Sequence, residues 1–381
     1  MKKSIIAIIF IFTVFVFPLK VSAETVPQVS TDEKNMYSDF GADNLYSSLS
    51  NEAKDSLVRM GVMSPSAESL ENVSVNSVLA EILREVSNQV GDVVSVSVMI
   101  IGVMLIYSIV QGLGSSFSSS SAKEVLSVVS SLSVACILVV PLTEIIGKSG
   151  EIIKLSSDFM LTYIPVMVAV LMACGRTLSG AGYYSLMVFY AEFITQVSSS
   201  VIVPALNVFL GISVSASLVP EMRLRGLLNT FSKAVKWLLS FMFTIFSALL
   251  TFRTLIAASA DSVSTRAVRY TMSSFVPVIG AALSEAYRTV SGSFALLRSG
   301  VGVFAIFAVF IMFLPIIIKL SLWMFSIGIL RNVAQIVDLS VPCELLSAVG
   351  SVLTVILAVI ICIAALYIIS TALIITAGGG V

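Results

Sequence analysis

Histidine is absent from the 381 residues, and only four cysteines and 12% charged residues are present. Without histidine, the chain lacks the usual general base, the Ser-His and Cys-His dyads and the commonest transition-metal ligand. The four cysteines lie in or beside apolar runs, and their spacing is not that of a metal site. We therefore expect no catalytic residues, no metal site and no cofactor, and we interpret the cysteines as small packing residues.

Apolar side chains are what the chain has in excess. Hydrophobic residues make up 57% of it, and its mean hydropathy is +1.03, whereas in soluble domains about 25% of the residues are charged. A membrane-spanning helix satisfies its own backbone hydrogen bonds, so apolar helical segments are stable in lipid. The sequence therefore predicts an all-α, polytopic helical membrane protein in contact with the lipid bilayer, and excludes a soluble globular domain.

The first 91 residues differ from the rest. Residues 1–23 have the pattern of a signal peptide, with cleavage expected between Ala23 and Glu24; an uncleaved first span is the alternative. The segment from Glu24 to Asp92 carries 12 acidic and 4 basic residues. Its end, from Val75 to Val90, has the spacing of an amphipathic helix that packs on the membrane surface, on the bundle or on a partner. We expect a signal peptide (1–23), an acidic extracytoplasmic region (24–91) and a multispanning domain (92–381).

Spans of about twenty apolar residues are expected near residues 93–110, 125–146, 159–174, 183–203, 237–257, 301–318 and 345–375. Three further regions leave the count open between seven and nine. They are the long apolar stretch 183–219, which contains Pro204, the stretch 275–297, and the segment 320–337.

Basic residues indicate the orientation. A helix over residues 220–236 combines an apolar stripe with four basic residues, a combination that favours the cytoplasmic leaflet: Arg223, Arg225, Lys233 and Lys236. Counted from an extracytoplasmic N-terminal region, four spans would leave this helix outside the cell. We therefore favour a split at Pro204, which adds the crossing that brings the basic helix to the cytoplasmic side.

Several charged residues lie within or beside apolar runs. Glu285 and Arg288 are one helical turn apart, so they can neutralise each other if neighbouring helices shield them, either as a structural ion pair or as a pathway lining. Glu192 is expected to be shielded from lipid, as an interhelical hydrogen-bond partner or as a proton or cation relay. Arg253 and Arg298, near the ends of apolar runs, are expected to extend to the membrane interface.

The chain combines a signal peptide, a short acidic region and a multispanning domain, in that order. It also contains two distinctive sequence segments, SFVPVIGAALSEAYRTVSGSFALLRSGVG at residues 274–302 and ITAGGGV at the C-terminus. On these features the chain resembles the stage III sporulation protein AE family of endospore-forming bacteria. The resemblance implies a non-enzymatic integral membrane component of a multiprotein transenvelope channel or secretion complex required for endospore formation. It implies no catalytic residues.

The same resemblance implies the mother-cell membrane around the forespore as the location. The implied partners are the other stage III sporulation operon membrane proteins and, through the complex, stage II sporulation protein Q; no nucleic acid is implied, and homo-oligomerisation stays open. The residues alone also allow a self-sufficient secondary transporter or permease, which Glu192 and the segments interrupted by proline and glycine favour.

Overall fold

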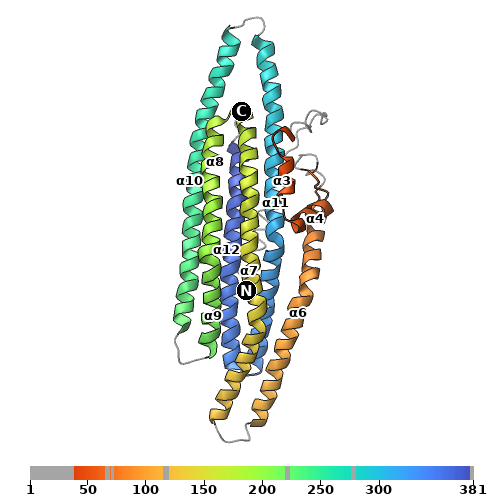
Figure 1. Ribbon diagram of the computed structural model, residues 1–381, viewed down its shortest axis with the longest axis vertical. Coiled ribbons are helices and arrows are strands. Elements are labelled where there is room, and N and C mark those ends of the chain that lie inside the picture. The colour runs from red at the N-terminus through yellow and green to blue at the C-terminus, as the bar shows by residue number, and fades with distance from the viewer. Residues whose placement is uncertain are drawn as a thin grey trace.

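The computed structural model describes residues 38–64, 69, 73–114, 120–218, 224–275 and 280–377; the side chains of 113–124, 216–225, 227–229, 231, 268–269 and 272–291 are not described. Every regular element in the described residues is a helix, as the sequence predicts. Two short helices, α3 (Asp43–Ser47) and α4 (Asn51–Arg59), precede a bundle of long ones (Figure 1). These are α6 (Val75–Gly114), α7 (Ser120–Ala173), α8 (Thr177–Val197), the π-helix η2 (Ser198–Ile202), α9 (Val203–Leu218), α10 (Leu224–Phe275), α11 (Gly280–Ile336) and α12 (Ser340–Ala377).

Six helical segments within the described residues are long and apolar enough to cross a membrane: Val75–Gly112, Val125–Ala173, Thr177–Ser215, Ser232–Ala267, Gly292–Ile336 and Ser340–Thr376. Several are much longer than a bilayer requires. The 54 residues of α7 correspond to a helix of about 81 Å, whereas the hydrocarbon core is about 30 Å thick. The predicted spans 125–146 and 159–174 are therefore parts of one helix, as are 301–318 and 320–337.

The expected split at Pro204 is wrong, because the chain continues through α8, η2 and α9 as one helical segment without a turn or loop. Proline normally breaks a helix, since it lacks an N–H group and its ring clashes with the carbonyl four residues earlier. Here the wider π-turn directly precedes it, and Val203 N–H donates to the carbonyl of Ser198. The local widening of the helix absorbs the proline without a break.

The expected orientation of the basic helix over residues 220–236 depends on an odd number of crossings before it. Two predicted spans merge in α7 and the division after Val203 disappears, so the described residues before 224 contain three candidate spans in place of the five expected, and this number is again odd. The start of α10 accordingly lies towards the same end of the bundle as the end of α6 and the start of α7 (Figure 1). That this end is cytoplasmic stays a prediction.

The core of the bundle is the antiparallel pair α11 and α12. α12 also packs against α7, α9 and α10, and its Tyr367 hydroxyl lies 2.8 Å from Ser157 Oγ of α7. At Gly302 of α11 a side chain would collide with Ile375 of α12. The side chain of Ile375 therefore packs directly on the bare backbone of α11 at Gly302, as small residues allow in membrane bundles.

The short helices α3 and α4 pack on the side of this bundle. Leu45 and Leu57 are fully buried, and the ring of Phe40 meets that of Phe294 edge-on, with centroids 5.8 Å apart. Arg59 Nε donates to Glu81 Oε2 of α6 over 3.0 Å, and this hydrogen bond raises the pKa of Arg59. These contacts hold the acidic N-terminal part of the described chain against the bundle.

The amphipathic part of α6 is continuous with the first candidate span. One side of its apolar stripe packs on the core through Val78, Ile82 and Val86. The other side, with Val75, Leu79, Leu83 and Val90, is exposed. The bundle thus covers about half of the stripe predicted from the sequence.

Candidate functional site

Glu192 is exposed on the outside of α8, where it makes no hydrogen bond or ion pair with other described residues. Glu192 is therefore not buried within the described part of the chain, and its shielding from lipid stays a prediction. The sequence places Glu192 in an apolar run, but the run is apolar on almost every side, so periodicity could not tell which face points outward.

The other predicted charges are only partly described. Positions 285 and 288 both lie in α11, one turn apart as expected, but the side chains of Glu285 and Arg288 are outside the described residues. The ion pair between them stays a prediction.

The basic helix and the cleavage site are likewise incomplete. Arg223, Ala23 and Glu24 lie outside the described residues, as does the side chain of Arg225. Lys233 and Lys236 are exposed near the start of α10, which is the placement that an interfacial basic helix requires.

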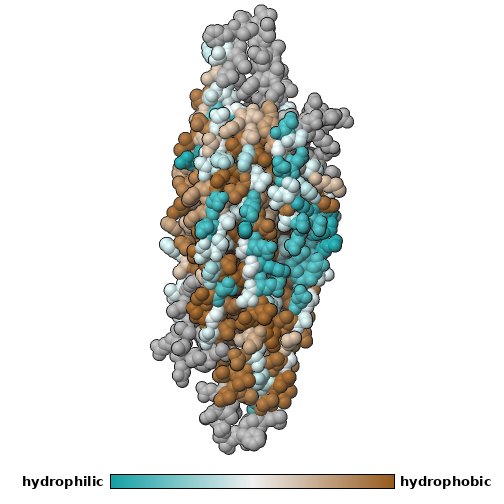
Figure 2. Space-filling model, in the orientation of Figure 1, coloured by the Kyte–Doolittle hydropathy of each residue, from teal (hydrophilic) through white to brown (hydrophobic). Residues whose placement is uncertain are grey.

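Glu192 belongs to a larger group of exposed polar side chains on two neighbouring helices. α7 packs against α8, η2 and α9, and an added Cβ on Gly150 would lie 2.7 Å from Val203 Cγ2 of α9. Figure 2 shows hydrophilic residues at mid-height, most densely on the right where α4 and the start of α6 lie and in smaller groups along the centre where α7 lies, with hydrophobic surface towards the lower end. We define the polar face as the exposed residues Glu144, Lys148, Glu151, Lys154 and Asp158 of α7 and Glu192, Gln196, Ser199 and Ser200 of α8 and η2.

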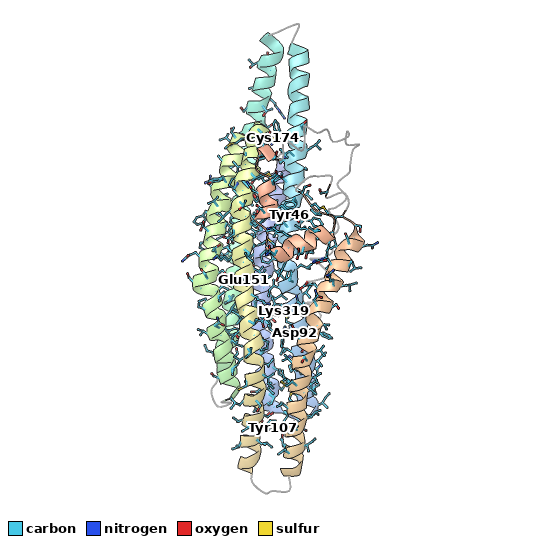
Figure 3. All side chains as sticks on the ribbon, turned by 45° about the vertical axis from the view of Figure 1, so that its right-hand side comes forward. Tyr46, Asp92, Tyr107, Glu151, Cys174 and Lys319 are labelled. Carbon is cyan, nitrogen blue, oxygen red and sulfur yellow. The ribbon has the colours of Figure 1, made fainter. Side chains whose placement is uncertain are left out.

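One end of the polar face is an ion cluster that reaches into the core. Lys319 Nζ of α11 lies 2.9 Å from Glu144 Oε1, and Lys148 Nζ lies 3.1 Å from the same oxygen. Only 18% of the Lys319 side chain is exposed, against 51% for Glu144. Figure 3 places Lys319 and Glu151 near the middle of the long axis, well away from either end.

The remaining charged side chains of the polar face form no close ion pair in the described part of the chain. The side chains of Glu151, Lys154, Asp158 and Glu192 make no hydrogen bond or ion pair among the described residues, although they lie in candidate spans. Gln196 Nε2 donates to Ser200 Oγ over 3.1 Å. The polar face therefore offers these charged side chains to whatever covers it.

The sequence analysis missed Lys319. Its partner Glu144 is 175 positions away, so no local spacing connects them. The available signal was the lone lysine itself, which interrupts the apolar run from Val301 to Val337 and requires a partner there.

A second group of buried charges lies where α7 meets α8. Asp261 of α10 is almost fully buried, and its two carboxylate oxygens accept the N–H groups of Leu178 and Ser179 over 3.1 and 2.8 Å. The carboxylate thus caps the start of α8 from another helix, favourably placed at the positive end of the helix dipole.

Arg298 of α11 does not extend to an interface as expected, because only 5% of it is exposed. Its Nε and Nη1 find no acceptor among the described residues. A position at the end of an apolar run indicates an interfacial arginine, but this local pattern contains no information on the tertiary packing that buries Arg298.

None of these groups has the composition of a metal site. Within the described ranges, no three or more histidine, cysteine, aspartate or glutamate side chains come together as ligands. The chemistry that the described polar groups can perform is hydrogen bonding, charge pairing and contact with water.

Comparison with known proteins gives one family. The sequence model of the family described as Stage III sporulation protein AE matches residues 61–378. The chain is also similar to Stage III sporulation protein AE of Bacillus subtilis (strain 168), with 22% identity over 161 residues, which is 42% of this chain and 40% of that protein. The aligned part thus covers less than half of that relative. No solved structure matches.

Proposed function

Since the chain belongs to the stage III sporulation protein AE family, we propose that it is a non-enzymatic component of a multiprotein channel or secretion complex. This complex would cross the envelope between mother cell and forespore. The chain would lie in the mother-cell membrane around the forespore. Its partners would be the other membrane proteins of the stage III sporulation operon and, through the complex, stage II sporulation protein Q.

The polar face is the observation that carries this proposal. Glu151, Lys154, Asp158 and Glu192 are exposed on helices that are otherwise apolar enough to cross a membrane. A charged side chain at the centre of a spanning helix costs about 2.5–3.5 kcal/mol on insertion scales when lipid surrounds it. A partner protein or a water-filled passage removes that cost, and a multiprotein channel supplies both.

The apolar exterior of α10 provides the contrast. Leu249 is 51% exposed and Phe252 67% exposed, and such side chains need no cover other than lipid. The proposal therefore distinguishes two outer surfaces: the polar face contacts protein or water, and the outer side of α10 contacts lipid.

Site-specific photocrosslinking in sporulating cells tests this distinction. A photoreactive amino acid at Ser199 lies on the polar face and leaves Glu192 intact; the same amino acid at Leu249 is the matched control on α10. We expect protein adducts of higher mass from position 199 and none from position 249. Protein adducts from 249 alone, with none from 199, would contradict the proposal.

A secondary transporter is the second candidate. The π-turn η2 and Pro204 directly follow the helix that carries Glu192, and helices with a local irregularity beside a charged residue occur at functional sites. Reconstitution of the purified chain in liposomes separates the two. Ion-coupled solute uptake without any partner would favour the transporter, and its absence together with protein adducts at position 199 favours the complex.

A further inference from the structure

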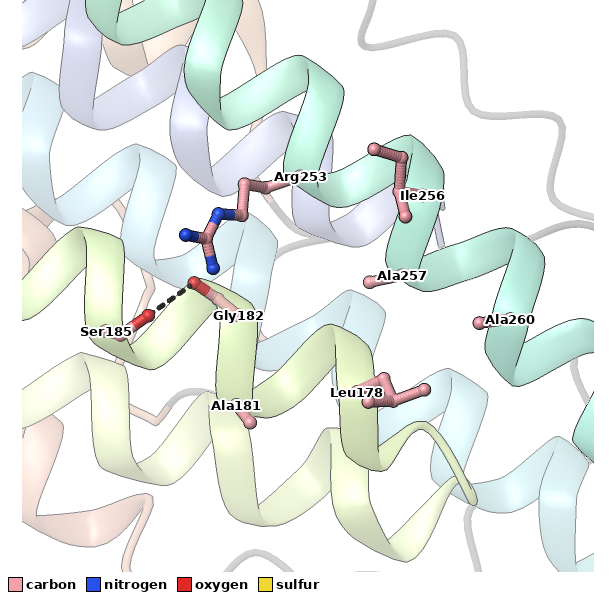
Figure 4. Close-up of a pocket in the computed structure, with 8 residues that line it drawn as sticks. All are labelled: Leu178, Ala181, Gly182, Ser185, Arg253, Ile256, Ala257 and Ala260. Carbon is pink, nitrogen blue, oxygen red and sulfur yellow. Dashed lines mark hydrogen bonds between the residues drawn. The ribbon is translucent and has the colours of Figure 1, made fainter.

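α8 and α10 leave an open groove between them, away from the ion cluster of the polar face. It has a volume of about 520 Å³. Figure 4 shows that residues from the first half of α8 form one wall and residues from the second half of α10 form the other. The lining residues are Leu178, Ala181, Gly182 and Ser185 of α8 and Arg253, Ile256, Ala257 and Ala260 of α10.

Small residues keep the α8 wall open. Nothing lies within 4 Å of the position that a Cβ on Gly182 would occupy. Ser185 Oγ donates to the carbonyl of Gly182 over 3.2 Å, so this hydroxyl stays close to its own helix. A bound group can therefore approach the α8 backbone closely at Gly182.

Arg253 is the cation of this groove. Its guanidinium points from α10 across to Gly182 and Ser185 (Figure 4), and it makes no hydrogen bond or ion pair among the described residues. The carboxylate of Asp261, eight residues further along α10, is already bound by the N–H groups of Leu178 and Ser179. Glu192 lies seven residues beyond Ser185, about 10 Å further along α8. The charge of Arg253 is thus uncompensated.

The surroundings of the groove are apolar. On α10, Phe252, Leu255 and Ile256 are 67%, 59% and 69% exposed, and all lie in the candidate span Ser232–Ala267. An anion free in water would lose its hydration next to this surface. An anion that carries its own apolar chains would gain contacts there instead.

From this combination we propose that the groove between α8 and α10 binds the headgroup of an anionic phospholipid. The guanidinium of Arg253 donates to the phosphodiester oxygens, in the bidentate geometry that arginine offers to phosphate. The acyl chains lie along the exposed apolar side chains of α10. The site is independent of the polar face and of the proposed function, because neither Glu192 nor the ion cluster takes part in it.

Retention of lipid by the purified full-length chain tests the proposal. The protein is reconstituted in nanodiscs with equal amounts of phosphatidylglycerol and phosphatidylcholine, extracted into mild detergent, and the co-purifying lipid is measured by native mass spectrometry. We expect roughly tenfold more phosphatidylglycerol than phosphatidylcholine on the wild-type chain, and a roughly tenfold loss of it in Arg253→Gln, since a charge-assisted hydrogen bond to phosphate is removed.

Arg266→Gln is the matched control, because Arg266 is an exposed arginine on the same helix outside the groove. This variant should retain phosphatidylglycerol as the wild type does. Ala181→Leu keeps Arg253 but fills the groove, and it should lose the lipid as well. Arg266→Gln and Ala181→Leu both change side chains on the outside of the bundle, so folding should be unaffected. A size-exclusion profile of each variant checks this.

Four results would overturn the proposal. They are equal retention of the two lipids by the wild type, undiminished phosphatidylglycerol on Arg253→Gln, undiminished phosphatidylglycerol on Ala181→Leu, and equal loss in Arg266→Gln. A soluble competitor separates the lipid from a free anion. If glycerol 3-phosphate displaces phosphatidylglycerol at a matching concentration, the groove is a site for a small phosphate and the lipid proposal fails.

Discussion

The central helices α11 and α12 and the outer helices α6 and α10 are all apolar enough to cross a membrane, yet their surroundings differ. In their most apolar windows, 72% of α11 and 61% of α12 are buried within the chain, against 17% of α6 and 11% of α10. Lipid accepts apolar side chains as readily as a protein core does. Hydrophobicity therefore predicts that a helix is in the membrane, but not where it lies in the bundle.

Close packing is what distinguishes the central pair. Gly302 faces Ile375 without room for a side chain, and Trp323 is almost fully buried. On α10, by contrast, Trp237 is 67% exposed. The chain has only two tryptophans, one in each environment, so the comparison can be tested with a matched pair of substitutions.

The largest effect is expected from Trp323→Ala. It empties a closely packed position in the core and should lower the free energy of unfolding by about 4 kcal/mol, the usual range for a buried aromatic residue. Trp237→Ala removes a side chain that contacts no core and should change it by about 0.5 kcal/mol or less. Thermal unfolding in detergent measures both. Equal losses in the two variants would remove the distinction between central and outer helices.

Gly302→Leu should be the next most damaging. The new side chain would collide with Ile375 and with Met167, and overpacking of this kind costs about 3 kcal/mol. Gly292→Leu is the control on the same helix, because nothing lies within 4 Å of a Cβ at that position. The yield of monodisperse protein after size-exclusion chromatography reports the difference. A normal yield of Gly302→Leu would show that α11 and α12 are less tightly packed than described.

Asp261→Ala should have a smaller effect, about 2 kcal/mol. It removes the acceptor for two N–H groups at the start of α8, and the loss of a helix cap costs up to about that amount. Asp261→Asn keeps an acceptor oxygen and should recover about half of the loss. Hydrogen exchange of the first turn of α8 follows the effect locally. Unchanged protection of Leu178 and Ser179 in Asp261→Ala would argue against the capping role.

The smallest difference in stability is expected between two substitutions in the ion cluster of Glu144, Lys148 and Lys319. Lys319→Ala removes the less exposed partner of Glu144 and should cost about 1 kcal/mol, whereas Lys148→Ala removes an exposed i,i+4 partner and should cost about 0.3 kcal/mol. Unfolding by denaturant in mixed micelles can resolve this difference. A larger loss of unfolding free energy in Lys148→Ala than in Lys319→Ala would mean that the exposed lysine of the polar face, and not the lysine of the core, holds Glu144 in place.

The composition was sufficient to predict an all-α membrane protein, because apolar content decides that question without any tertiary contact. Helix boundaries were less predictable. Pro204 reads as a break, and only the π-turn before it shows why the helix continues. The charges in α7 between Glu144 and Asp158 look like the end of one span and the start of another, although they form a polar stripe on one helix.

The candidate site was predictable only in part. Glu192 could be found as a charge in an apolar run, whereas its exposure depends on which face α7 and α10 cover. The pairing of Lys319 with Glu144 and the burial of Arg298 arise from segments far apart in the sequence, so no local pattern contains them. Glu285 and Arg288 are the opposite case, because their local spacing alone predicts an ion pair. That prediction is still open.

The serine-rich turn η2 has a consequence for the direction in which α9 faces. A π-turn accommodates one residue more than an α-turn, and each residue rotates an α-helix by about 100°. Loss of a single residue between Ser198 and Ile202 would therefore convert the π-turn into an α-turn and leave Leu206, Phe209 and Leu210, which are now buried, on the same side of the helix. Loss of a residue from the α-helical turn after Pro204 would instead rotate these three side chains by about 100°.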